Sequence, residues 1–134
     1  MKWLLDSNSC IRYLNGRAPA IKLHLDAIDD ADILVCSIVK AELAFGAAGS
    51  VDPVRAAANQ HHFLSRFVSL SFDDRCVETY GSIRSYLSKR GTPIGPNDVL
   101  IAAIAIANGV TLVTHNTAEF SRVPGLLWED WETP

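Results

Sequence analysis

Short apolar runs alternate with longer helix-like segments along the whole chain, and this alternation restricts the fold more than any other feature. Four runs of strand length end in polar or turn residues, at 2–6, 33–36, 67–70 and 111–113, and 126–128 indicates a fifth strand at an edge. Short buried strands separated by helices are typical of parallel sheets covered on both faces. We therefore expect an α/β fold: a three-layer α/β/α domain around a central, mostly parallel sheet of four or five strands.

The segments between these runs carry start and stop signals for helices. Ser7 or Asn8 suits an N-cap, and Pro19 suits the first turn of the following helix. The segment 96–108 is almost wholly apolar, so we expect a helix buried against the sheet. Helices are expected over about 8–15, 19–30, 37–49, from 53 onward, 74–90 and 96–108.

Composition and length favour one globular domain over residues 1–134. Hydrophobic residues make up 49% of the chain and charged ones 20%, which excludes a disordered composition. No apolar run has the length of a membrane span, and Asp6 interrupts any signal-peptide core. The cysteines (Cys10, Cys36 and Cys76) are odd in number and lack CxxC spacing, so we expect reduced, cytoplasmic thiols and no zinc site.

Four residues far apart in the sequence carry most of the functional information: Asp6, Glu42, Asp98 and Asn116. Asp6 closes the first strand, and Asn116 follows the fourth by three residues. Asp98 opens the helix over 96–108, and Glu42 lies about two turns into the helix after the second strand. In a parallel sheet these positions share the carboxyl edge, where ligands of open α/β folds bind. Three carboxylates and a carboxamide there suit Mg²⁺ or Mn²⁺.

Each of these residues also has a purely structural interpretation. Asp6 and Asn116 are ordinary turn and capping residues, and an acid such as Asp98 in a first helical turn favours the helix dipole. Ser7 and Thr114 supply hydroxyls at the same strand ends, where they could hold metal-bound water as a second shell or make local turn bonds. Independent caps have no reason to converge on one edge, so the combination favours a site.

Glu42 has two possible roles, as a metal ligand or as a partner in a buried salt bridge. Apolar residues surround it at helical spacing, which indicates that it interrupts a buried face: Ile38, Ala41, Phe45 and Ala48. An unpaired buried carboxylate costs several kcal/mol. The sequence therefore predicts either a metal or an Arg or Lys partner beside Glu42, and leaves that choice open.

Two further polar residues lie near the fourth strand. Glu119 is either another acid of the site or part of a solvated face, and its position favours the solvated face. His115 could contact a phosphate, although a lone loop histidine is more often simply exposed. The net charge of −3 is not that of a typical nucleic-acid binder, but an acidic metal site lowers it.

Five segments of the chain carry a further signal through their order and spacing: Leu4–Asn8, Ser37–Leu43, Gly95–Ala103, Leu112–Asn116 and Phe120–Leu126. In that order and spacing they resemble the PIN-domain ribonucleases, and more closely the VapC-type toxins of prokaryotic toxin–antitoxin pairs. The resemblance implies that Asp6, Glu42 and Asp98 are the three core acids, with Asn116 at a fourth position that is often Asp. It also implies a structured RNA substrate, a homodimer, and inhibition by a small VapB-like antitoxin.

The ligand set predicts a mechanism in which a metal-activated water hydrolyses a phosphodiester. We therefore expect a Mg²⁺- or Mn²⁺-dependent endoribonuclease. A metal-dependent phosphatase is one alternative, although it would favour a second acid two residues after Asp6, where the chain has Asn8. A catalytically silent PIN-like module that binds RNA or protein is another. No GxGxxG follows the first strand, which excludes a dinucleotide-binding domain.

Overall fold

A five-stranded parallel sheet forms the centre of the computed structural model, which describes residues 1–133. Every strand pair is parallel, and the order across the sheet is β3-β2-β1-β4-β5. The strands are β1 (Trp3–Leu5), β2 (Ile33–Cys36), β3 (Val68–Leu70), β4 (Thr111–Val113) and β5 (Trp128–Glu129). The predicted parallel sheet is confirmed, and the fifth strand lies at its edge.

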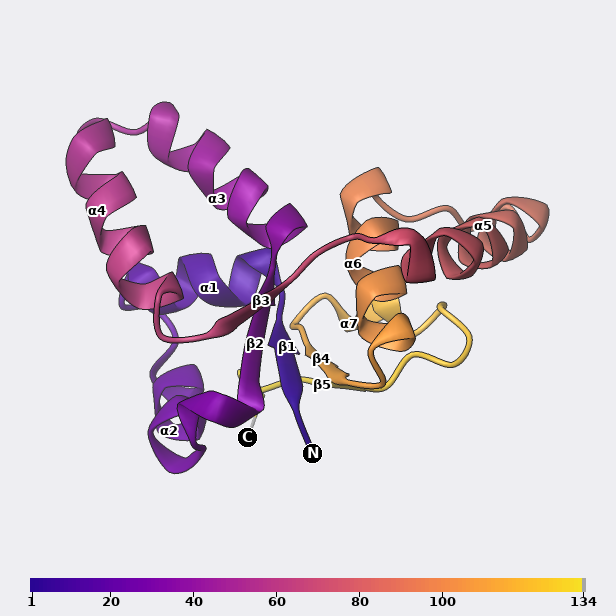
Figure 1. Ribbon diagram of the computed structural model, residues 1–134, viewed down its shortest axis with the longest axis horizontal. Coiled ribbons are helices and arrows are strands. Elements are labelled where there is room, and N and C mark those ends of the chain that lie inside the picture. Colours follow the sequence, from indigo (N-terminus) through magenta and orange to yellow (C-terminus); the bar gives the residue numbers. More distant parts are fainter. Residues whose placement is uncertain (134) are drawn as a thin grey trace.

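Seven α-helices and one 3₁₀ turn cover the sheet. They are α1 (Ser7–Leu14), α2 (Pro19–Ala27), η1 (Asp30–Asp32), α3 (Ser37–Ala48), α4 (Pro53–Leu64), α5 (Asp74–Lys89), α6 (Pro96–Ala107) and α7 (Thr117–Phe120). Figure 1 shows α1 to α4 on one side of the strands and α5 to α7 on the other, which confirms the three-layer α/β/α architecture. Within residues 1–133, no helix has both the length and the apolar character that a membrane span requires.

Several predicted boundaries were wrong, each for a local reason. Asp6, and not Ser7 or Asn8, is the N-cap of α1, because its carboxylate already accepts a bond from the first turn. The helix predicted over 19–30 ends at Ala27, since Ile28 is extended, and η1 follows. Backbone pairing also begins β5 at Trp128, two residues later than predicted.

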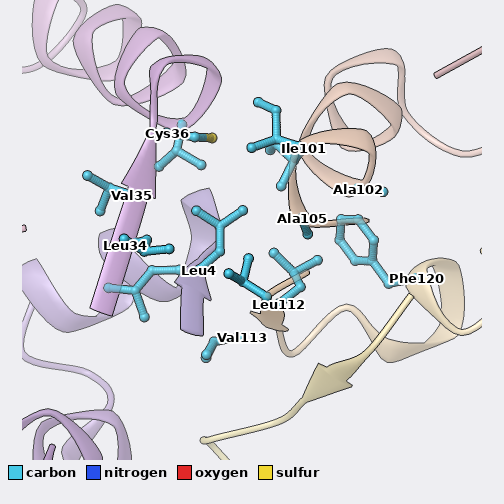
Figure 2. Packing of buried hydrophobic residues seen from close by; sticks show 14 of the residues in the cluster. Leu4, Leu34, Val35, Cys36, Ile101, Ala102, Ala105, Leu112, Val113 and Phe120 are labelled. Carbon is cyan, nitrogen blue, oxygen red and sulfur yellow. The ribbon is translucent and has the colours of Figure 1, made fainter. Parts of the chain in front are cut away.

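The core joins the sheet to α6. Side chains of the central strands, such as Leu4 and Leu112, are fully buried, as are Ile101 and Ala102 of α6. Figure 2 shows these residues facing one another, with Phe120 closing the cluster from α7. Burial of one Leu or Ile side chain contributes about 1.5–3 kcal/mol, so this packing fixes where β1, β4 and α6 stand relative to one another. The prediction that α6 is buried is confirmed.

The order of the strands creates a switch point at β1. From β1 the chain proceeds outward to β2 and β3, and β4 then returns to the opposite side of β1. The ladder between β1 and β4 continues into the next residue, where the Asp6 amide donates to the Val113 carbonyl at 3.1 Å. Crevices outside the carboxyl ends of strands at such points are the usual ligand sites of open α/β sheets.

Candidate active site

Asp6 lies at the switch point and is buried, with 4% of its surface exposed. Its Oδ1 accepts a hydrogen bond of 2.8 Å from the Ser9 amide, which caps α1. Burial raises the pKa of Asp6, and the neighbouring Ser9 and Thr114 partly offset that rise. Asp6 therefore caps a helix at the switch point of the sheet, and a second role as a metal ligand there stays a prediction.

Asp98 lies in the first turn of α6 and is half-buried. Its pKa is raised to about 7, first by burial, then by repulsion from and a hydrogen bond with Glu119, and then by the charges of Glu42 and Asp6. Asp98 therefore lies within electrostatic reach of the other two acids predicted from the sequence, Asp6 and Glu42, and of a fourth acid, Glu119.

Glu42 lies on the half-exposed side of α3 and accepts a hydrogen bond of 2.5 Å from the Ser7 hydroxyl. The predicted environment was wrong: the buried face of α3 is formed by Val39, Leu43 and Ala47, whereas Phe45 is 84% exposed. The helix is apolar on several faces, so spacing alone did not identify the one that packs. None of the described Lys or Arg side chains forms an ion pair with Glu42.

Ser7 bridges α1 and α3 through this bond, so it makes more than a local turn bond. Thr114 lies between Asp6 and Asn116 at the end of β4. Its Oγ1 accepts from the Asn116 amide at 3.0 Å, and its side chain lowers the pKa of Asp6. Both hydroxyls thus hold residues of the acidic cluster in place, and whether they also hold metal-bound water stays a prediction.

Asn116 is oriented by Glu119. The Nδ2 group of Asn116 donates to Oε2 of Glu119 at 2.8 Å, which leaves its Oδ1 as the oxygen available to a ligand. The preference for a solvated Glu119 was wrong, because this side chain is half-buried and bonded to both Asn116 and Asp98. The spacing of Asn116 and Glu119 across one turn of α7 was the only sequence signal for this contact.

The C-terminal segment adds charges at the rim of the crevice. Glu132 forms an ion pair with Arg12 of α1, and its negative charge contributes to the raised pKa of Asp6. His115 is exposed, as expected, and its Nδ1 lies 2.9 Å from a carboxylate oxygen of Asp130, which raises the pKa of the imidazole.

The cluster is a loose arrangement of oxygen donors. Among the residues that the structure describes, no three Asp, Glu, His or Cys side chains form a ready-made shell around a metal. Mg²⁺ does not require such a shell, because it retains several waters and binds through one or two carboxylates. Carboxylates of Asp6, Glu42, Asp98 and Glu119, with the Asn116 carboxamide, are hard oxygen donors of the type that Mg²⁺ and Mn²⁺ prefer.

The thiols belong to the core instead of the site. Cys10, Cys36 and Cys76 are all free and buried, and burial raises the pKa of each. Since the thiolate is the nucleophilic form, these side chains act as small apolar groups.

Comparison with known proteins supports this assignment of the fold. The PIN domain family model matches residues 3–126. The chain is 36% identical over 131 residues to the tRNA(fMet)-specific endonuclease VapC of Salmonella typhimurium, with 98% of both proteins covered. It is 37% identical over 133 residues to ribonuclease VapC2 of Rickettsia felis, with 98% of this chain and 99% of the relative covered.

Solved structures give the same result. VapBC2 from Rickettsia felis, bound to a DNA fragment from its promoter, superposes with a TM-score of 0.92 at 36% identity, covering 98% of this chain and 99% of that one. DNA-bound VapBC from Salmonella typhimurium also gives 0.92 at 36% identity, with 98% of both chains covered. The chain therefore belongs to the PIN-domain family and, within it, to the VapC-type toxins.

Proposed function

We propose that this chain is a Mg²⁺- or Mn²⁺-dependent endoribonuclease and the toxin of a VapBC-type pair. The observation that carries the proposal is a cluster of carboxyl groups near the sheet's switch point, in which burial and the charges of Glu119, Glu42 and Asp6 oppose the ionisation of Asp98. A site of mutually repelling carboxylates is costly without a cation. Relatives of the same length and fold that are named ribonucleases support the reaction class.

Asp6 and Asp98 are the proposed principal ligands, with Glu42 and Asn116 completing the oxygen set. The bound metal would supply Lewis-acid stabilisation of the phosphate and activation of a water for in-line attack. Ser7 holds Glu42 in position through its hydroxyl, and Thr114 lies beside Asp6 and lowers the pKa of that carboxyl. Glu119 orients the Asn116 amide, and Asp98, whose pKa is raised to about 7, must lose its proton before a cation binds tightly.

Cleavage of RNA by the purified chain tests this proposal. Total RNA is incubated with the protein in EDTA and then with added Mn²⁺ or Mg²⁺, and the ends of the products are mapped. We expect cleavage only with metal, leaving 3′-hydroxyl and 5′-phosphate ends, because water is the nucleophile. Asp6→Asn is the matched control, since Asn is as good an N-cap as Asp and so preserves α1. Metal-independent cleavage, or equal cleavage by this variant, contradicts the proposal.

A structured RNA is the proposed substrate, and tRNA(fMet) is the first to test. The Salmonella relative, at 36% identity over nearly the whole chain, is named for cleavage of that tRNA. Cleavage of tRNA(fMet) by this chain, compared with an elongator tRNA under identical metal, measures the preference directly. Equal rates on both would remove the proposed substrate while leaving the nuclease assignment intact.

The proposed partners are a VapB-like antitoxin and a second copy of this chain. The neighbouring structures are VapBC complexes. An acidic crevice attracts a peptide that carries Arg or Lys, and such a side chain would compete with the metal for the same carboxylates. Expression of the chain alone should stop growth, co-expression with its antitoxin should restore it, and sedimentation of the purified chain should show a dimer. Harmless expression of active protein would contradict the toxin role.

A further inference from the structure

The absence of a side chain at Gly95 leaves the space in which the Asp98 carboxylate lies. A Cβ atom built at Gly95 would lie 3.1 Å from Oδ2 of Asp98 and 3.6 Å from its Cγ. A contact of 3.1 Å is tighter than nine in ten real Cβ contacts, so one of the two groups would have to move by a few tenths of an ångström. The flexible group is the carboxylate, because the backbone carbonyl of Gly95 is fixed by a hydrogen bond of 3.1 Å from the Val99 amide.

The backbone itself does not require glycine at this position. Gly95 has φ −53° and ψ 143°, which every residue adopts readily, whereas Gly91 just before it has a φ of +68° that favours glycine. Helix capping does not require it either. Gly95 is the N-cap of α6, and Ser, Asp or Asn would be at least as favourable there. The contact with Asp98 is therefore the one constraint that the structure places on this residue.

The direction of the displacement matters for the site. The charges of Glu119, Glu42 and Asp6 act on the Asp98 carboxylate, so its position relative to them determines the geometry of the proposed site. A Cβ at position 95 would displace Oδ2, and a shift of even a few tenths of an ångström alters a metal site that requires near-octahedral geometry. Loss of catalysis by roughly 10²-fold is typical when a reacting group moves by about 1 Å.

We propose that Gly95 is a positioning residue: its missing side chain holds open the place of the Asp98 carboxylate in the acidic cluster. The inference rests on the proposed metal-dependent nuclease activity, which it refines by adding a residue that touches neither metal nor RNA. It also has a consequence that needs no metal, namely an energetic coupling between positions 95 and 98.

Gly95→Ser separates this role from helix capping. Serine introduces the obstructing Cβ but is a favourable N-cap, so α6 should start normally. We expect Mn²⁺ binding to the protein alone, measured by calorimetry, to weaken about tenfold, and kcat on RNA to fall by about 10–100-fold with an unchanged KM for RNA. Gly95→Ala should behave alike. Wild-type Mn²⁺ affinity in Gly95→Ser with a defect in Gly95→Ala would show that Gly95 acts only as a cap, and would overturn the proposal.

Gly81→Ala is the matched control. A Cβ at Gly81, within α5, would meet nothing within 4 Å. Alanine should therefore leave Mn²⁺ affinity and cleavage unchanged and raise the melting temperature slightly, as expected for Gly to Ala in a helix. A defect in Gly81→Ala equal to that in Gly95→Ser would show a general sensitivity to glycine replacement and would contradict a specific role.

A double-mutant cycle in EDTA distinguishes this inference from the proposed function. Gly95→Ser should lower the melting temperature when residue 98 is Asp, and should lose that effect in an Asp98→Ala background, where no carboxylate obstructs the new Cβ. Additive effects refute the positioning role. No Mn²⁺ binding and no cleavage by the wild type would refute the nuclease proposal, whereas equal Mn²⁺ affinities in wild type and Gly95→Ser would refute the role of Gly95 alone.

Discussion

Replacement of Asp98 by Asn should stabilise the metal-free protein, and the gain should depend on pH. The folded state raises the pKa of Asp98 from 3.8 to about 7, so the folded protein holds a proton that the unfolded chain has released. For a carboxyl group shifted upward, stability is lost as pH rises from the unfolded pKa to the folded one, and it stays lost above that. Asparagine carries no charge and can still donate to Glu119, so it escapes this loss.

The size of the effect follows from the shift. About three pKa units correspond to about 4 kcal/mol at full strength. Because Asp98 is only half-buried and solvent screens its charge, we reduce this to about 1–2 kcal/mol. For a domain of this size that is a rise of roughly 3–8 °C in melting temperature near pH 8. Near pH 4 the pH has only just passed the unfolded pKa of 3.8, so little of this loss has accumulated, and Asp98→Asn should melt within about 1–2 °C of the wild type.

The assay is thermal unfolding in EDTA from about pH 4 to pH 8, followed by circular dichroism for the wild type and two variants. Glu78→Gln is the control, because it removes one carboxylate from an exposed position on α5. Its curve should parallel that of the wild type. If Asp98→Asn also parallels the wild type across this range, the carboxylates do not converge on Asp98 and the argument for a metal site loses its main support.

Further predictions concern the remaining site residues. Asp6→Asn should abolish RNA cleavage while melting within about 2–3 °C of the wild type, because Asn keeps the cap of α1; turnover at the wild-type rate contradicts the assignment. Glu42→Gln should also lose activity without losing metal-free stability, and a fall of about 3–5 kcal/mol in the free energy of unfolding would instead indicate a lost buried ion pair. Asn116→Asp places a carboxylate beside Glu119, so metal-free stability should fall while calorimetry shows tighter Mn²⁺ binding at a second site. Unchanged titration would mean that Asn116 is only a turn residue.

The fold could be predicted from the sequence because the apolar pattern, the strand lengths and the helix signals all indicate the same α/β architecture. Strands such as Ile33–Cys36 are short, apolar and buried on both faces, which only a covered parallel sheet provides. Errors arose at the ends of helices and strands, because local hydrogen bonds determine at which residue an element begins or ends. Asp6, Ser7 and Asn8 are all suitable N-cap residues, and Asp6 is the cap because its carboxylate accepts a hydrogen bond from the Ser9 amide.

The site was only partly predictable because burial in an apolar helix is set by packing. Helix α3 carries apolar residues on several faces, so its sequence does not reveal that Val39, Leu43 and Ala47 pack while Phe45 lies in solvent. Glu42 was therefore placed correctly at the sheet edge but in the wrong environment. Glu119 was expected on a solvated face for a related reason. Its interaction with Asp98 connects α7 with α6, and the local sequence around either residue gives no sign of it.

Convergence of like charges is itself evidence of function in this molecule. A chain under selection for stability alone has no reason to place Glu119, Glu42 and Asp6 where their charges oppose the ionisation of Asp98. None of the ion pairs in residues 1–133 involves any of these four carboxylates. Under the proposed function, a bound cation or a basic side chain of the antitoxin would relieve this repulsion, and both would act on the same carboxylates. Metal and antitoxin should therefore compete: raising Mn²⁺ should weaken the binding of a basic peptide to the wild type, and should leave its binding to Asp6→Asn less affected.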